Sequence, residues 1–192
     1  MLTKVSFKIL MKYYDCIFLD RDGTINPDPP PGYISKLENF KFYNFTFEAL
    51  KILSKITKNF IIVTNQSGVS RGIIHEDDLI RINNFIIREF LDHSIPLLDI
   101  YYCTDHPDDE SINRKPGVGM FLSANKDFDI NLSKSLMIGD SLSDMKPAFK
   151  LNMDSMLVMT GNGKVDKNCF EKDSSPTFYA KNILNGAKLL VR

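Results

Sequence analysis

The chain has 192 residues, of which 43% are hydrophobic and 25% charged, and its 24 basic residues balance 24 acidic ones. This profile predicts a soluble globular protein and disfavours a nucleic-acid partner or an anionic membrane, because no excess of basic charge would hold either. Apolar runs stay well short of the ~20 residues that a membrane-spanning helix needs. The three cysteines, Cys16, Cys103 and Cys169, are odd in number and far apart, which favours a reducing cytoplasm over a disulfide framework.

The first residues differ from the rest of the chain. Lysines interrupt their apolar residues and no small-residue cleavage site follows, so a signal peptide is not expected. We expect one domain over residues 13–192, preceded by an extension over residues 1–12, and Met11 is an alternative start.

Short apolar segments then alternate with amphipathic ones. Short apolar segments predict strands at 16–20, 60–64, 97–103, 135–140 and 154–159, and most of these segments are rich in β-branched or aromatic residues. Apolar residues at helical spacing predict helices from Thr46 to about Thr57 and from about Glu76 to Asp92, and further helices are expected at 119–128, 144–152 and 180–191. Pro147 fits the fourth helix only near its first turn. The alternation predicts an α/β fold with a mainly parallel central sheet between two layers of helices.

Polar residues follow the ends of the predicted strands, and ligands of parallel sheets bind beyond the carboxyl ends of the strands. These residues are Asp20 and Asp22 after the first strand, Thr64, Asn65 and Gln66 after the second, Cys103, Asp105 and His106 after the third, Arg114 and Lys115 on the loop leading out of it, and Asp140 and Asp144 after the fourth. One edge of the sheet is therefore predicted to collect acids, a hydroxyl, an amide and a lysine.

The acids suit metal binding and phosphoryl transfer. Asp20 and Asp140 could supply the oxygen ligands that Mg²⁺ prefers. Asp22 need not be ionised, because a neighbouring like charge raises the pKa of a carboxyl group. One acid as nucleophile and a second as proton donor is an arrangement that phosphoryl transfer can use. The alternative is an ordinary solvated turn around Asp20 and Asp22.

The remaining polar residues suit an anionic ligand. Thr64 and the following "NQSGVSRG" offer a hydroxyl, backbone amides and tight turns, although an ordinary loop has the same composition. Lys115 could neutralise the charge of a transferring phosphoryl group. Asp144 lies one helical turn beyond Asp140 and could orient it or its waters. The alternative for this last stretch is a helix start, with Ser141 or Ser143 as the cap and Asp144 as an acid of the first turn.

Taken in order, "DRDGT", "TNQSG", "RKPG" and "GDSLSD" resemble the four motifs of the haloacid dehalogenase (HAD) superfamily. The resemblance covers residues 16 to about 164 and implies a Rossmann-like three-layer sandwich that performs aspartyl-phosphate chemistry with Mg²⁺. No segment between the motifs is long enough for a large cap domain. An open site of this kind should take a small soluble molecule.

The resemblance implies a role for each motif residue. Asp20 would be the nucleophile, and Asp22 would protonate the leaving group and then activate water. Thr64 and Lys115 would hold the phosphoryl oxygens. Asp20, the backbone carbonyl of Asp22 and the side chain of Asp140 would bind Mg²⁺.

Narrower features resemble the heptose bisphosphate phosphatase family, with the histidinol-phosphate phosphatases close behind. They are "DRDGTIN" with a tyrosine downstream, "TNQSGVSRG", "RKPGVGM" and "LVMTGNGK". This likeness implies removal of the 7-phosphate from D-glycero-D-manno-heptose 1,7-bisphosphate on the route to lipopolysaccharide or another surface glycan. The residues expected near substrate are Arg21, Asp28, Tyr33, Asn65, Gln66, Ser67, Arg71 and Arg114, with Arg114 reading the distal part of the sugar.

One departure concerns zinc. Relatives often carry a structural zinc loop, but here only Cys103 matches a ligand position, while Asp105, Ser111 and Asn113 replace one histidine and two cysteines. Structural zinc needs four sulfur or nitrogen ligands. We therefore predict no zinc.

Other functions stay open at this point. Histidinol-phosphate phosphatase activity would require a pocket for an imidazole and an amine, and a catalytically silent phosphate-binding or regulatory domain would not need the competent motif residues that are present. A polynucleotide end-phosphatase is disfavoured by the neutral charge balance. The expected protein is a cytoplasmic monomer that acts on a small sugar phosphate.

Overall fold

The computed structural model describes residues 12–28, 32–170 and 175–192. Residues 1–11, most of the predicted N-terminal extension, lie outside the described residues. In the described part of the chain, no helix is long and apolar enough to cross a membrane.

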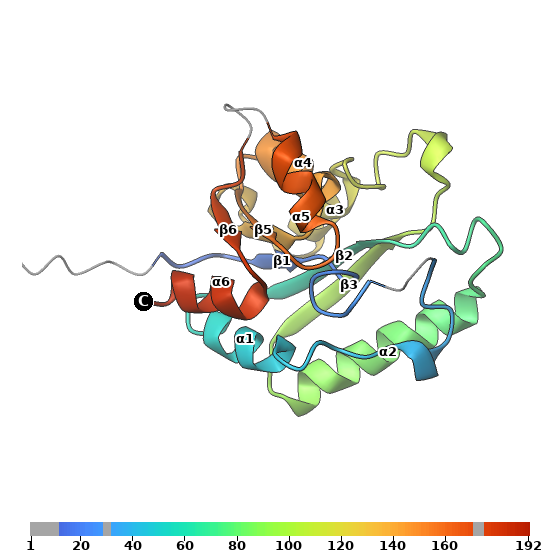
Figure 1. Ribbon diagram of the computed structural model, residues 1–192, viewed down its shortest axis with the longest axis horizontal. Coiled ribbons are helices and arrows are strands. Elements are labelled where there is room, and N and C mark those ends of the chain that lie inside the picture. Colours follow the sequence, from blue (N-terminus) through green and yellow to red (C-terminus); the bar gives the residue numbers. More distant parts are fainter. Residues whose placement is uncertain (1–11, 29–31, 171–174) are drawn as a thin grey trace, which may run out of the picture.

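A six-stranded sheet forms the centre of the protein (Figure 1). Its strands are β1 (Ile17–Leu19), β2 (Phe60–Asn65), β3 (Leu97–Cys103), β4 (Leu136–Gly139), β5 (Asp154–Val158) and β6 (Phe178–Ala180). Their order is β3-β2-β1-β4-β5-β6, and every neighbouring pair is parallel. The predicted parallel α/β fold is therefore confirmed.

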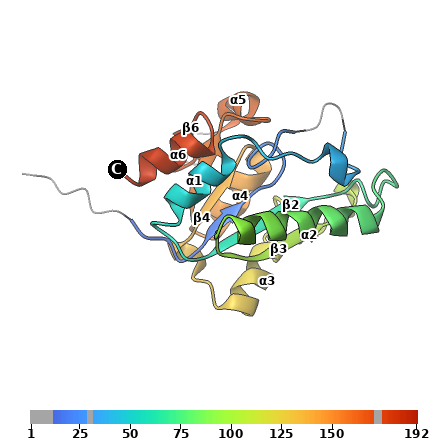
Figure 2. The same cartoon turned by 90° about the horizontal axis from the view of Figure 1, so that it is seen from below.

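Helices cover both faces of the sheet. They are α1 (Thr46–Leu53), α2 (Glu76–Asp92), α3 (Gly119–Phe128), α4 (Leu142–Lys150), α5 (Gly163–Asp166) and α6 (Ile183–Leu190). Helices α1, α2 and α6 lie on one side, and α3 and α4 on the other; Figure 2 shows the first three in front of the sheet. Short 3₁₀ turns lie at Leu37–Asn39, Pro107–Asp109, Leu132–Lys134 and Lys167–Cys169.

Two hydrophobic cores follow from the alternation of side chains along the strands. In β2, Phe60 and Ile62 belong to the core under α1, α2 and α6, whereas Ile61 and Val63 belong to the core under α3 and α4. All four are fully buried. Because both faces of a covered parallel sheet are buried, its central strands are continuous apolar runs, as the sequence of β2 is.

The structure differs from the sequence-based boundaries in a few places. Helix α1 ends at Leu53 rather than near Thr57, and β6 was not predicted. Helix α4 begins two residues before the predicted start, because Ser141 and Asp144 form a capping box at its amino end. Pro147 consequently lies inside the helix and not in its first turn.

The strand order explains where a site can form. The chain runs from β1 outward to β3 on one side and returns to build β4 to β6 on the other side. The connections therefore diverge at the carboxyl ends of β1 and β4, which leaves a crevice where such sheets bind ligands. Asp20 directly follows β1, and Asp140 directly follows β4.

Candidate active site

A pocket of about 180 Å³ lies at this point of divergence. Ten residues from the ends of β1, β2 and β4, from the first turn of α4 and from loops line it: Asp20, Asp22, Thr64, Asn65, Lys115, Asp140, Ser141, Ser143, Asp144 and Asn162. The structure thus gathers the motif residues that the sequence placed at separate strand ends.

Lys115 is the cation at the bottom of the pocket. Its ammonium donates to Asp20 Oδ1 and to Asp144 Oδ1, both at 2.6 Å, and to the carbonyl of Val63 at 2.7 Å. Its side chain is 2% exposed, and the charges of the two carboxylates outweigh the effect of burial and raise its pKa above the usual value. Lys115 therefore stays charged and holds Asp20 in one orientation.

Asn65 fixes the backbone of Lys115. Its side-chain amide donates to the carbonyl of Lys115 and accepts from the amide of Lys115, both at 2.9 Å. Asn65 was expected near substrate, and its recorded contacts join β2 to the loop that carries the lysine.

Asp144 contacts Lys115 and the start of α4, not Asp140, in its recorded hydrogen bonds. Its Oδ2 accepts from the backbone amide of Ser141 at 3.0 Å and from the Ser141 hydroxyl at 2.7 Å. The helix-start alternative from the sequence is therefore confirmed, and the same carboxylate also supports the lysine.

Asp140 sits in a cradle of glycines. Its Oδ2 accepts from the backbone amide of Asn162 at 2.7 Å. A Cβ added at Gly23 or at Gly161 would collide with the Asp140 carboxylate, and both glycines have positive φ values, 83° and 49°. Only glycine takes up such a backbone so close to a side chain.

Three buried carboxylates make this a candidate divalent-cation site. Asp20, Asp140 and Asp144 offer oxygens within 4.8 Å of one another. Burial, together with repulsion from Asp20 and Asp144, raises the pKa of Asp140 to about 9. For Asp20, burial outweighs the charge of Lys115 and raises the pKa to about 7. Hard carboxylate oxygens that repel one another suit Mg²⁺, so the residues present fit this ion.

Asp22 has a different environment. Burial favours its neutral form, but the charge of Arg21 and hydrogen bonds from Asn26, Arg21 and Gln66 outweigh burial and hold its pKa below the usual range. The prediction that like charge raises the pKa of Asp22 is wrong, because three donor side chains contact it more closely than any acid does.

Arg21 and Gln66 lie beneath Asp22 rather than in the open pocket. Each is 1% exposed, and both donate to Asp22 Oδ2. Gln66 also donates to Thr64 Oγ1 at 2.9 Å. Both were expected near substrate, but they are buried and contact Asp22 from the side away from the pocket.

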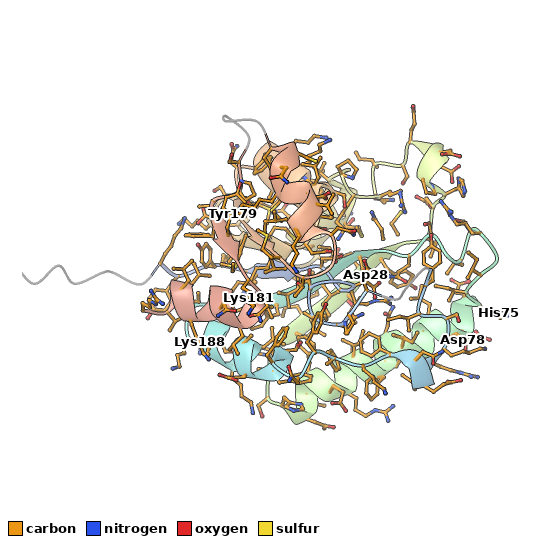
Figure 3. All side chains as sticks on the ribbon, in the orientation of Figure 1. Asp28, His75, Asp78, Tyr179, Lys181 and Lys188 are labelled. Carbon is orange, nitrogen blue, oxygen red and sulfur yellow. The ribbon has the colours of Figure 1, made fainter. Side chains whose placement is uncertain are left out.

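The lining of the pocket does not include the other residues that were expected near substrate, Asp28, Tyr33, Ser67, Arg71 and Arg114. The hydroxyls of Tyr33 and Ser67 are hydrogen-bonded at 3.0 Å, and Arg71 is exposed. Asp28 belongs to the loop after β1 and lies away from His75 and Asp78 at the start of α2 and from Tyr179, Lys181 and Lys188 in the segment that contains β6 and α6 (Figure 3). Burial and the charge of Asp22 raise the pKa of Asp28.

The loop after β3 is held by hydrogen bonds. The thiol of Cys103 donates to Asp105 Oδ2 at 3.3 Å, and hydrogen bonds from Ser111 and Cys103 hold the pKa of Asp105 below its usual range. The sequence supplies one thiol at the four positions of a zinc loop, so this donor set does not suit zinc. The absence of zinc remains a prediction.

Some residues of the site were not singled out from the sequence. Asn26 is fully buried and donates to Asp22 Oδ1 at 2.8 Å, and Asn162 contacts Asp140 through its backbone. Burial and the charges of Asp140 and Asp28 raise the pKa of Tyr43. Asn26 lies in the "DRDGTIN" stretch and Asn162 in the "TGNGK" stretch. The two glycines of "TGNGK" were the feature of the sequence that could have pointed to Asn162.

Comparison with known proteins gives the family. Residues 112–185 match the family described as HAD-hydrolase-like. The D-glycero-beta-D-manno-heptose-1,7-bisphosphate 7-phosphatase of Photorhabdus laumondii is 39% identical over 153 residues, 76% of this chain and 80% of that protein. The enzyme of the same name from Escherichia coli K12 is 37% identical over 160 residues, 79% of this chain and 83% of that protein. The chain belongs to the HAD-like phosphatases.

Solved structures of this phosphatase family share the fold. The D,D-heptose 1,7-bisphosphate phosphatase of B. bronchiseptica, crystallised with magnesium and phosphate, superposes with a TM-score of 0.82 at 25% identity, over 92% of this chain and 98% of that one. The corresponding protein of Burkholderia thailandensis gives a TM-score of 0.67 at 20% identity, over 93% of this chain and 99% of that one, and shows the fold alone.

Proposed function

We propose that this HAD-like phosphatase removes the 7-phosphate of D-glycero-D-manno-heptose 1,7-bisphosphate, with Mg²⁺, through an aspartyl phosphate on Asp20. The observation that carries the proposal is the convergence of Asp20, Lys115 and Asp140 in one pocket, with Asp22 beside them. The names of the relatives support the substrate, since the matches extend over about four fifths of each relative.

Asp20 is the nucleophile in this proposal. Lys115 fixes its Oδ1 at 2.6 Å, so the other carboxylate oxygen is left to attack phosphorus. The hydroxyl of Thr64 donates to a phosphoryl oxygen, and the charge of the lysine ammonium offsets the negative charge that develops on the phosphoryl group. Asp22 donates a proton to the leaving oxygen and then accepts one from the attacking water.

Mg²⁺ would be held by Asp20, Asp140 and the backbone carbonyl of Asp22. When bound, the ion neutralises negative charge on the phosphoryl group and on the carboxylates. The high pKa of Asp140 supports this assignment, because the metal-free site carries more negative charge than Lys115 compensates.

The rest of the substrate lies outside the pocket in this proposal. A volume of about 180 Å³ accommodates a phosphoryl group but not the whole heptose bisphosphate, so part of the sugar and its second phosphate extend out of the pocket. We expect Tyr33, Ser67, Arg71, Asp28 and Arg114 to contact them. The expected setting is the cytoplasm, in the synthesis of nucleotide-activated heptose for lipopolysaccharide or another surface glycan, with the protein as a monomer.

The test of the proposed chemistry is the replacement Asp20→Asn. It keeps an acceptor for Lys115 and removes the nucleophile, so phosphate release in Mg²⁺ should fall by about 10³-fold or more while the circular dichroism spectrum is unchanged. The matched control is Asp154→Asn, which removes a carboxylate that contacts Lys12 and Tyr14 at the other end of the sheet and should leave the rate unchanged. Phosphate release by Asp20→Asn at a rate near that of the unmodified protein would refute the assignment.

A further inference from the structure

The carboxylate of Asp22 accepts four hydrogen bonds from three side chains. Arg21 donates from Nε at 3.1 Å and from Nη2 at 2.7 Å, Gln66 donates from Nε2 at 2.9 Å, and Asn26 donates from Nδ2 at 2.8 Å. Asp22 is itself 21% exposed at its side chain, whereas the three donors are at most 1% exposed. The donors therefore hold the carboxylate from below while its open side faces the pocket.

The two oxygens of this carboxylate are not equivalent. Oδ2 receives three of the four hydrogen bonds, two from Arg21 and one from Gln66. A carboxylate oxygen has two lone pairs, so Oδ2 has none left for a proton. A proton placed there would also point at three nitrogen donors. Oδ2 is consequently an anchoring atom.

Oδ1 receives one hydrogen bond, from Asn26. In the described part of the chain no second protein donor is recorded at this oxygen, so one of its lone pairs is open. The pocket is also lined by Asp20, the proposed nucleophile, and by Lys115. Oδ1 is thus the oxygen that can exchange a proton with a ligand in the pocket.

Gln66 forms hydrogen bonds with Arg21, Asp22 and Thr64. Its Oε1 accepts from Arg21 Nη2 at 3.0 Å, and because Arg21 can only donate, the amide must present Nε2 to Asp22. The same Nε2 reaches Thr64 Oγ1, and the backbone amide of Gln66 donates to the carbonyl of Cys103 at 2.7 Å. The position of Asp22 is therefore fixed to the end of β2.

We propose that Gln66 and Arg21 are positioning residues that anchor Asp22 through Oδ2, so that Oδ1 alone carries the proton during catalysis. This inference rests on the proposed function, because it assigns an atom and two supporting residues to the acid–base step. It also replaces the expectation that Gln66 and Arg21 contact substrate.

The proton balance of both steps passes through Oδ1. Because hydrogen bonds and the charge of Arg21 hold the pKa of Asp22 below its usual range, Oδ1 takes up one proton from solvent before the first step. In the first step an Asp20 oxygen bonds to phosphorus, the bond from phosphorus to the 7-oxygen of the sugar breaks, and that oxygen takes the proton from Asp22 Oδ1. In the second step a water oxygen bonds to phosphorus, its proton passes to Asp22 Oδ1, and the bond from phosphorus to Asp20 breaks. Both carboxyl groups then have their starting protonation.

The test is a double-mutant cycle with Gln66→Met and Asp22→Asn, measured as phosphate release from heptose 1,7-bisphosphate in Mg²⁺. Met has a similar length and cannot donate to Asp22. Gln66→Met should lower kcat about 10- to 100-fold with KM within about twofold, since general acid–base catalysis is worth about 10²- to 10⁴-fold. In the Asp22→Asn background, Gln66→Met should lower kcat less than about twofold further, because a residue that acts through Asp22 has nothing left to position.

Two results would overturn the inference. A rise in KM with unchanged kcat would make Gln66 a substrate contact, and a full multiplicative loss in the Asp22→Asn background would make its role independent of Asp22. If Asp22→Asn alone leaves kcat unchanged, the proposed acid–base role fails instead, so the two failures are distinguishable.

Folding is controlled with two further variants. Gln66→Glu keeps the shape and the acceptor for Arg21 but turns the donor to Asp22 into an acceptor, so it should show the same kinetic pattern if Gln66→Met does not fold. Asn59→Ala removes a side-chain amide that donates to the carbonyl of Asp15 at the opposite end of the sheet, and should leave kcat unchanged.

Discussion

Lys115 provides the positive charge that compensates the buried acids of the pocket. It is buried between Asp20 and Asp144, and Asp140 lies close to both acids. Isolated charges are strongly disfavoured in a protein interior, so removing one partner of a buried ion pair costs far more than removing a surface one. The lysine therefore stabilises the fold as well as the proposed reaction.

Lys115→Met should lower the free energy of unfolding of the metal-free protein by about 3–5 kcal/mol, because it leaves buried carboxylates without a counter-charge. The matched control is Lys188→Met, whose partner Glu48 is exposed, and it should cost less than about 1 kcal/mol. Urea unfolding followed by circular dichroism measures both. If both variants lower the free energy of unfolding by the same amount, Lys115 contributes no more to stability than an exposed lysine does.

The sequence predicted which residues meet at the site but not which atoms they contact. Asp20, Thr64 and Lys115 could be placed together because each follows a predicted strand of one parallel sheet. Arg21 and Gln66 could not be placed beneath Asp22, because their burial depends on side-chain directions and on the ring of Phe40, 5.9 Å from the Arg21 guanidinium. Spacing along the chain carries no such information.

At the scale of elements, two loops shape the position of Asp140. The loop after β1 brings Gly23 against the carboxylate, and the loop after β5 brings Gly161 against it from another direction. Both close approaches depend on the absence of a side chain. The loops therefore set how far the Asp140 oxygens reach into the pocket.

Gly161→Ala should raise the Mg²⁺ concentration needed for half-maximal activity at least about tenfold, because its methyl group would displace Asp140. Gly72→Ala is the matched control: Gly72 also has a positive φ, 68°, but an added Cβ would meet nothing within 4 Å. It should cost some stability and leave the Mg²⁺ dependence unchanged. Titration of activity with Mg²⁺ decides the matter, and identical curves for both variants would contradict the role given to the loop.

Element boundaries were predictable where the local signal was strong. Helix α2, with apolar residues at regular helical spacing, and β3 match their predicted ranges. Strand β6 has three residues and only Ala180 buried, so its pairing with β5 comes from tertiary contact and not from a local pattern. The start of α4 required recognition that Asp144 belongs to a capping box.

At the scale of the whole molecule, the site couples stability to pH and metal. The usual aspartate pKa is 3.8, and in the folded metal-free protein the pKa of Asp20 is about 7 and that of Asp140 about 9. Between about pH 4 and pH 9 the folded state therefore binds more protons than the unfolded state, and the free energy of unfolding falls as pH rises. In the proposed function Mg²⁺ would bind the ionised carboxylates, so it should oppose this fall.

In EDTA, the contribution of these two acids should make the protein less stable at pH 8 than at pH 5, and added Mg²⁺ should stabilise it more at pH 8 than at pH 5. Urea unfolding at both pH values, with and without Mg²⁺, measures this. Asp140→Asn should reduce both the pH dependence and the effect of Mg²⁺. An unmodified protein whose Mg²⁺ stabilisation is larger at pH 5 would contradict the assignment.

The parallel sheet and its helical layers followed from alternation along the chain, and the position of the pocket followed from the carboxyl ends of the strands. The loops around Tyr33, Ser67 and Arg114 are less predictable, because loops of similar composition can take many conformations. In the proposed function these loops contact the sugar and its second phosphate, so substrate choice is the property that most needs a direct measurement.

That measurement compares phosphate release from D-glycero-D-manno-heptose 1,7-bisphosphate and from histidinol phosphate at equal concentration in Mg²⁺, with the remaining sugar phosphate identified by NMR. We predict a kcat/KM at least about tenfold higher for the heptose bisphosphate, because only it offers a second phosphate to these loops, and heptose 1-phosphate as the product. Comparable or faster turnover of histidinol phosphate, or release of the 1-phosphate instead, would contradict the proposed function.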